Sequence, residues 1–201
     1  TDQPMVEVSF TLPLLDANGN QLSTFDGYRI MYGGIIDLAF DFNGQLYIMD
    51  HKTTTRLGDY YFNQYKPNNQ MTGYIWGMSQ LTNRTVGGAW INAIGLYKKS
   101  PPEFKRGLTQ RSAEDIAAWV HDVHHSCNLM RAAMITGEFP KFTNACTLYG
   151  KCEFYDVHTL SGAKQQDRFL EQMYEHEEWD HESRGNSVNL DKYNEASSPD
   201  E

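Results

Sequence analysis

The sequence predicts an α/β or α+β domain built on a β-sheet with helices. Three strand-like segments precede the first helical segment, and a fourth strand separates that helix from a second, longer one. The dipeptide Asn43-Gly44 lies between the second and third strands, and it is the strongest short signal for a two-residue hairpin turn. The order is therefore strand, strand, strand, helix, strand, helix.

The strand segments are rich in β-branched and aromatic residues. The first alternates between apolar and polar positions and ends in a turn at residues 16–20. The second is apolar and is interrupted by Gly33-Gly34. We expect these strands, in order, over residues 5–15, 28–42, 45–55 and 86–97.

The helices are marked by their ends. Pro67 is expected at the first position of a helix that runs to residue 81, because proline is favoured there. Ser112 has the pattern of an N-cap with Asp115 in the first turn, and that helix is expected to run to about Thr136 and end at Gly137. Three further segments are expected as a basic loop, an irregular segment and a last helix: residues 98–111, 144–158 and 162–178.

The charge is concentrated at the C-terminal end of the chain. The 201 residues carry 17 Lys and Arg against 26 Asp and Glu, a net charge of −9. Residues 166–201 hold eleven of the acids and three of the bases, which leaves the rest of the chain near neutral. The net charge therefore does not exclude a DNA partner. We expect a domain over residues 1–160 and, over residues 161–201, a helix followed by an acidic tail that is disordered after His181.

Composition also narrows the class of protein. No apolar run is long enough to span a membrane, so no membrane partner is expected. Three cysteines are too few for a disulfide scaffold, and their odd number favours a reducing, cytoplasmic compartment. The chain begins with Thr1 and enters a strand almost at once, so we expect that a leading helix is missing from it.

The hairpin brings two carboxylates together. With Asn43-Gly44 as the turn, Asp37 lies opposite Asp50 on one face, with Cβ atoms about 4.5–5.5 Å apart. Lys52 lies on the same face, two residues further on. A divalent cation would offset the repulsion between the two acids. We expect the residues of the other face to supply the core: Ile36, Leu38, Phe40, Phe42, Tyr47 and Met49.

Two acids and a lysine on one sheet face suit metal-assisted phosphodiester hydrolysis. The metal polarises a phosphoryl oxygen and lowers the pKa of a bound water. The lysine orients that water and stabilises the charge that develops on the phosphorus. The alternative from these residues alone is a structural ion-pair network at a strand end.

Three motifs in this order resemble the RecB-like branch of the PD-(D/E)XK nuclease superfamily, over residues 5–158. They are G-x-x-D at residues 34–37, D-x-K at residues 50–52 and Q-x-x-x-Y at residues 70–74. The resemblance implies a restriction-endonuclease-like core with a central mixed β-sheet flanked by helices. It also implies a nuclease of bacterial or bacteriophage exonuclease type, acting on DNA in recombination, replication or repair. The alternative is a non-catalytic nucleic-acid-binding module with a degenerate nuclease fold.

The resemblance assigns roles to individual residues. Asp37, Asp50 and the backbone carbonyl of His51 would bind Mg²⁺ or Mn²⁺, and Lys52 would be the catalytic lysine. Gln70 and Tyr74 lie on one helical face, which in the family looks toward the active site. Glu7 is an accessory metal candidate, and recombination or replication proteins in a bacterial or phage-infected cell are candidate partners. The candidates for DNA contact are Thr53, Thr54, Arg56, Lys98, Lys99, Lys105 and Arg106.

A second candidate metal site lies toward the end of the domain. Cys146, Cys152 and His158 have the spacing C-x5-C-x5-H, and several RecB-like nucleases hold an iron–sulfur cluster in this region. These three ligands could hold such a cluster or zinc only with a fourth from elsewhere. Cys127 falls within a helix and is expected to pack. Free thiols remain the alternative reading of this segment.

Overall fold

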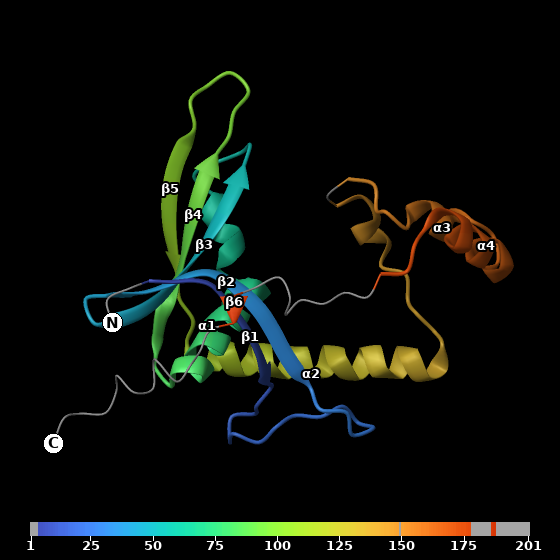
Figure 1. The fold of residues 1–201 in the computed structure, drawn as a ribbon, viewed down its shortest axis with the longest axis horizontal. Helices are drawn as coiled ribbons and strands as arrows, with labels where there is room; N and C mark the ends of the chain where they lie inside the picture. Colours follow the sequence, from blue (N-terminus) through green and yellow to red (C-terminus); the bar gives the residue numbers. More distant parts are fainter. Residues whose placement is uncertain (1–3, 149, 178–185, 188–201) are drawn as a thin grey trace. The chain divides into compact units, whose positions relative to one another are not determined.

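The computed structural model describes residues 4–148, 150–177 and 186–187 (Figure 1). The chain divides into two compact units. The first comprises Thr1–Leu129 with His181–Glu201, and the second comprises Met130–Asp180. The boundary between the two units falls at residues 129 and 130, inside a helix that spans Ala113–Thr136. The domain end expected at residue 160 stays a prediction. Apart from residues 186–187, the predicted disordered tail after His181 lies outside the described residues.

The first unit is built on one mixed sheet, with strand order β5-β4-β3-β2-β1-β6. Neighbouring strands are antiparallel except for two parallel pairs, β3 with β4 and β1 with β6. The central mixed sheet with helices confirms the predicted fold class. The strand bounds are β1 Met5–Pro13, β2 Met31–Phe42, β3 Gln45–Thr54, β4 Val86–Gly95, β5 Glu103–Thr109 and β6 Asn186–Ser187.

Two α-helices accompany the sheet, α1 (Asn69–Thr82) and α2 (Ala113–Thr136), and a short 3-10 helix η1 (Tyr61–Tyr65) precedes α1. Helix α1 contacts β2, β3 and β4. It does not begin at Pro67 as predicted, because the Asn68 side chain is the N-cap and accepts the Met71 N–H at 3.0 Å.

The predicted start of α2 is confirmed by two reciprocal hydrogen bonds. The Ser112 hydroxyl accepts the N–H of Asp115, and the Asp115 carboxylate accepts the N–H of Ser112. The predicted end of α2 is confirmed at Gly137, whose φ of 71° is the left-handed conformation typical of a helix C-terminus.

The core lies on the sheet face that α1 covers. Leu46, Ile48 and Asp50 alternate along β3 and are all buried there, together with Ile91 and Ala93 of β4. The prediction that the opposite face supplies the core is therefore wrong for most of its residues. Leu38, Phe40, Tyr47 and Met49 are only half-buried and Phe42 is exposed, although Ile36 is buried. The sheet face that carries Asp50 is the core face because α1 packs against it.

The segment predicted as a basic loop contains a strand. Glu103–Thr109 forms β5 and pairs with β4 from Gly95↔Glu103 to Ala89↔Thr109. Lys98 and Lys99 lie in the connection between these two strands, and the β4–β5 hairpin projects from the sheet (Figure 1). Pairing with an existing edge strand overrode the loop-like composition of this segment.

The second unit has little interior. It contains η2 (Thr143–Thr147), α3 (Tyr155–Thr159) and α4 (Ala163–Met173), so the segment predicted to be irregular is partly helical and the last helix is shorter than predicted. Among its described residues only Val157 is a buried hydrophobic residue. None of the described helices is long and apolar enough to span a membrane.

Candidate active site

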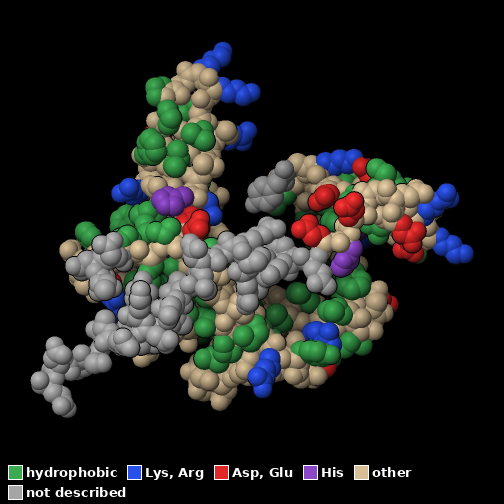
Figure 2. Space-filling view, viewed as in Figure 1, with side chains coloured by type: hydrophobic (Ala, Val, Ile, Leu, Met, Phe, Trp, Pro, Cys, Tyr) green, Lys and Arg blue, Asp and Glu red, His purple; other side chains and the backbone are tan. Residues whose placement is uncertain are grey.

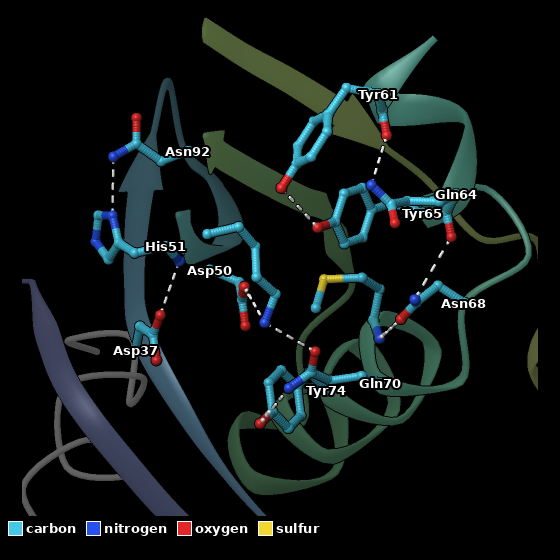
Figure 3. A network of polar contacts seen from close by, with 12 residues as sticks. Asp37, Asp50, His51, Tyr61, Gln64, Tyr65, Asn68, Gln70, Tyr74 and Asn92 are labelled. Carbon is cyan, nitrogen blue, oxygen red and sulfur yellow. Dashed lines mark hydrogen bonds and ion pairs between the residues drawn. The ribbon is translucent and has the colours of Figure 1, made fainter. Parts of the chain in front are cut away.

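β2 and β3 pair in the predicted register and then diverge. The register runs from Phe42↔Gln45 to Leu38↔Met49, and Asp37 with Asp50 would be the next pair. The ladder stops before them, although β3 continues to pair with β4 on its other edge, where Asp50 lies opposite Ile91. The expectation of directly opposed carboxylates is therefore wrong. Asp37 reaches across the divergence, where its Oδ2 accepts the backbone N–H of His51 at 2.7 Å (Figure 3).

Asp50 is a buried acid paired with one lysine. Its side chain is 3% exposed, and its Oδ2 lies 2.7 Å from Nζ of Lys52, whose side chain is 29% exposed. Burial raises the pKa of the Asp50 carboxyl above its usual value, and the charge of Asp37 adds to the rise, while Lys52 acts in the opposite direction. Because Asp50 is shielded from water, the charged form of its carboxyl depends on a nearby positive charge such as that of Lys52.

Lys52 is also held from the side of α1. Its Nζ donates to Oε1 of Gln70 at 3.1 Å, and Nε2 of Gln70 donates to the Tyr74 hydroxyl at 3.1 Å (Figure 3). The first turns of α1 thus present Gln70 and Tyr74 to the strand that carries Lys52. The structure therefore connects the D-x-K and Q-x-x-x-Y residues through one ion pair and two hydrogen bonds. Burial raises the pKa of Tyr74, so its hydroxyl stays protonated at neutral pH.

The glycine of G-x-x-D is packed against the tyrosine of Q-x-x-x-Y. A Cβ added at Gly34 would lie 2.8 Å from Cε1 of Tyr74 and 3.2 Å from the Phe10 ring. Phe10 in turn meets Tyr74 edge to face, with ring centroids 6.5 Å apart. The Tyr74 ring therefore occupies the space that a side chain at Gly34 would fill. This contact packs the first motif against the third.

The oxygen donors at this site suit a hard divalent cation. Oδ2 of Asp50 is buried and accepts no hydrogen bond of good geometry, since its ion pair with Lys52 is its one close polar contact among the described residues. Carboxylate and carbonyl oxygens are the ligands that Mg²⁺ prefers, usually from one or two carboxylates completed by water and substrate phosphates. Nowhere in the described residues do three or more His, Cys, Asp or Glu side chains gather to hold a metal.

Glu7 has an unusual backbone beside this site. It lies on β1 between the pairs Val6↔Leu38 and Val8↔Ile36, and so faces the position of Asp37 on β2 without pairing with it. Its φ of 51° is uncommon for a residue with a side chain. The structure thus places the accessory candidate on the strand next to Asp37, with its side chain exposed.

The candidate DNA contacts do not share one face. Along β5, Lys105 lies on the core side opposite Ala93 and is paired with Glu103 at 3.0 Å, whereas Arg106 points to the other face. Figure 2 shows basic side chains at the end of the projecting hairpin, the connection that holds exposed Lys98 and Lys99. Thr53 and Thr54 are the last residues of β3 and Arg56 follows it. Thr53 and Arg56 are exposed, and Thr54 is half-buried and accepts the Arg56 N–H.

A polar row on the outer face was missed by sequence reasoning. Nδ1 of His51 lies 2.8 Å from Nδ2 of Asn92, and Nε of Arg106 donates to Oδ1 of Asn92 at 3.1 Å. Asn92 therefore links His51 of β3 to Arg106 of β5 through the two atoms of its amide. No local signal marks Asn92, since it meets His51 only through the pairing of β3 with β4.

The cysteine segment is not assembled as a metal site. Cys152 donates its N–H to the carbonyl of Cys146 at 2.8 Å, so the two are close in the backbone. His158 is exposed, and the described part of the chain gathers no three such side chains around one point. The prediction of an iron–sulfur cluster or zinc thus finds no support in the geometry. Cys127 is half-buried and packs, as predicted, against a core cluster formed by Leu14, Ile30, Trp76, Trp119 and Val120.

This combination of fold and motifs is matched by one family. The profile of the PD-(D/E)XK nuclease superfamily matches residues 5–157, and the chain belongs to that superfamily. The match runs from β1 into α3, and so includes all three motifs and strands β1 to β5 of the mixed sheet. The restriction-endonuclease-like core implied by the sequence resemblance is confirmed. No curated protein matches the chain significantly in sequence.

The solved structures that are similar to this chain include the following two. One is SSO0001, with a TM-score of 0.42 and 12% sequence identity, over 77% of this chain and 59% of that one. The other is a presumed exonuclease of Eubacterium rectale, with a TM-score of 0.45 and 16% identity, over 79% of this chain and 53% of that one. The chain therefore spans less than two thirds of the length of either protein.

Proposed function

We propose that this chain is a metal-dependent nuclease that hydrolyses phosphodiester bonds of DNA. The observation that carries the proposal is the position of Lys52. Its ammonium group lies between a buried carboxylate, Asp50, and a side chain of the facing helix, Gln70. A structural ion pair needs only the first of these contacts, whereas a lysine that acts on substrate must be held in one orientation.

Asp37, Asp50 and the carbonyl of His51 are the proposed ligands of Mg²⁺ or Mn²⁺, with Glu7 as an accessory ligand. When bound, the ion would polarise a phosphoryl oxygen and lower the pKa of a coordinated water. Burial raises the pKa of Asp50 and so disfavours its charged form. A cation bound between the two carboxylates would offset this cost.

Lys52 is the proposed catalytic residue. An ammonium group has three N–H donors; one is donated to Gln70, and the group also forms an ion pair with Asp50. A remaining N–H can meet the attacking water or a phosphoryl oxygen, where the positive charge stabilises the charge that develops in the transition state. Gln70 and Tyr74 hold the ammonium group in place. Thr53, Thr54, Arg56, Lys98, Lys99, Lys105 and Arg106 are the proposed contacts to the DNA backbone.

The test is cleavage of linear and circular duplex DNA with Mn²⁺ or Mg²⁺, and again with EDTA. We expect metal-dependent loss of the linear DNA, and loss of linear DNA alone would support the exonuclease mode that the sequence resemblance implies. Cleavage of both linear and circular DNA would support a nuclease but exclude a purely exonucleolytic mode. A role of this chain in DNA recombination, replication or repair stays a prediction that rests on the sequence resemblance.

The decisive variants are Lys52→Ala and Asp50→Asn, each expected to abolish cleavage while the circular dichroism spectrum is unchanged. Lys164→Ala is the matched control, because Lys164 is an exposed lysine of α4. Full activity of purified Lys52→Ala would overturn the proposal. DNA binding with no cleavage by the unmodified protein would instead support the non-catalytic binding module.

A further inference from the structure

Arg111, in the connection between β5 and α2, directs its guanidinium group inward. Nε donates to Oγ1 of Thr72 at 2.6 Å, and Nη2 donates to the carbonyls of Tyr65 at 2.8 Å and Asn68 at 3.4 Å. Nη1 donates to Oγ1 of Thr109 and to the carbonyl of Gln110, both at 2.7 Å. One side chain therefore joins the end of β5 to the end of η1 and the first turn of α1.

The partners of Arg111 form a closed network with one another. The Thr72 hydroxyl donates to the carbonyl of Asn68, and the Thr109 hydroxyl donates to the carbonyl of Tyr65. Thr72, Thr109 and Tyr65 are buried. The carbonyls of Tyr65 and Asn68 thus each accept both the Arg111 guanidinium and a threonine hydroxyl, which links the end of η1 to the first turn of α1.

Electrostatics alone would not favour an arginine here. The N-terminus of a helix carries a partial positive charge that disfavours a nearby cation, and the first turn of α1 contains no acidic residue. Burial lowers the pKa of the Arg111 guanidinium, with Asp115 acting in the opposite direction. What arginine provides is a planar fork of donors that fixes several acceptors at once.

The turn that Arg111 holds is the turn that carries Gln70. Gln70 is exposed and its side chain is hydrogen-bonded to Lys52 and Tyr74, so its position depends on the backbone of α1. From the geometry we infer that Arg111 is a positioning residue for Lys52, acting through the first turn of α1 and Gln70. The inference rests on the proposed nuclease function.

The test is a kinetic double-mutant cycle. We expect Arg111→Lys and Arg111→Met to lower kcat about 10- to 100-fold, since small misplacements of catalytic groups have effects of this size. KM for DNA and the half-saturating Mn²⁺ concentration should stay within roughly twofold. Adding Arg111→Met to Gln70→Ala should lower kcat by no more than about twofold further, because both changes remove the same constraint.

The matched control is Arg84→Gln, at the opposite end of α1, where Arg84 is paired with Asp41. It should leave kcat unchanged. A second readout is amide hydrogen exchange without metal. The N–H groups of Met71 and Thr72 are bonded to Asn68, and they should exchange faster in Arg111→Lys but not in Arg84→Gln.

Two results would overturn the inference. One is a double variant in which the losses of Arg111→Met and Gln70→Ala multiply. The other is a raised KM with unchanged kcat, which would make Arg111 a DNA contact. If the Arg111 variants fail to fold, the Thr72 hydroxyl that accepts from Arg111 is substituted instead. Thr72→Val should lower kcat, whereas Thr72→Ser should not. An unchanged kcat in Thr72→Val would contradict the inference. Active Lys52→Ala protein would mark the failure of the nuclease proposal itself.

Discussion

Oδ2 of Asp37 accepts the backbone N–H of His51 at 2.7 Å, across the point where β2 and β3 stop pairing. The side chain thus supplies the hydrogen bond that the ladder no longer makes. The same carboxylate belongs to G-x-x-D, where its charge is proposed to bind a cation. The hydrogen bond needs only an acceptor oxygen, whereas the cation needs a charge, so the two roles can be separated by substitution.

Asp37→Asn should fold normally but lose its response to metal. The amide oxygen can still accept from His51, so the free energy of unfolding without metal should change by no more than about 1 kcal/mol. The unmodified protein should gain about 2.7 kcal/mol at a Mn²⁺ concentration one hundred times the Kd, and the variant should gain little. Thermal denaturation with and without Mn²⁺ measures both quantities. Asp41→Asn, on the same strand, should respond like the unmodified protein, and an equal response from Asp37→Asn would exclude it as a ligand.

Asp50→Asn should separate stability from activity. Burial disfavours the charged carboxyl, and Lys52 is exposed enough to be solvated when its partner becomes neutral. We therefore expect the metal-free variant to be at least as stable as the unmodified protein in urea denaturation, while cleavage is lost. A loss of more than about 2 kcal/mol would show that the ion pair with Lys52 outweighs the cost of burying Asp50.

Gly34→Ala should impair both folding and cleavage. The new methyl group would meet the Tyr74 ring at 2.8 Å, and overpacking of this kind destabilises proteins by about 1–3 kcal/mol. Displacing Tyr74 also removes the partner of Gln70, so kcat should fall. Gly58→Ala is the matched control, because a Cβ there meets no atom within 4 Å. Chemical denaturation and steady-state cleavage test the pair. A fully stable and active Gly34→Ala protein would show that the Tyr74 ring has room to move.

The Asp41–Arg84 pair should give a pH-dependent contribution to stability. The hydrogen bond from Arg84 lowers the pKa of Asp41 below its usual 3.8 in the folded protein. The contribution is therefore present above pH 3.8 and is lost as the pH falls through the lowered folded value. Both side chains are substantially exposed, so it should be below about 1 kcal/mol. The difference in free energy of unfolding between the unmodified protein and Arg84→Gln, measured at neutral and strongly acidic pH, tests this. A difference that grows on acidification would contradict it.

Local chemistry was enough to predict much of this molecule. The turn at Asn43-Gly44, the cap at Ser112 and the helix end at Gly137 each depend on one or two residues and their neighbours, and each is confirmed. The motif residues also follow the chain: Asp50 and Lys52 share a face through strand alternation, and Gln70 and Tyr74 share one through helical spacing. Patterns of this kind are set by backbone geometry within a few residues.

The sequence by itself predicted the order of the elements from β1 to β4 and the register of the hairpin, and it named the residues of the candidate site: Asp37, Asp50, Lys52, Gln70 and Tyr74. Only the tertiary structure decided which sheet face α1 covers, where β2 leaves β3, that residues 103–109 form a strand, and that Arg111 braces the first turn of α1. These features depend on contacts between residues distant in the chain, such as Arg111 with Tyr65. Such contacts form only when they satisfy buried polar groups and bury apolar surface together, and no local spacing in the sequence encodes that balance.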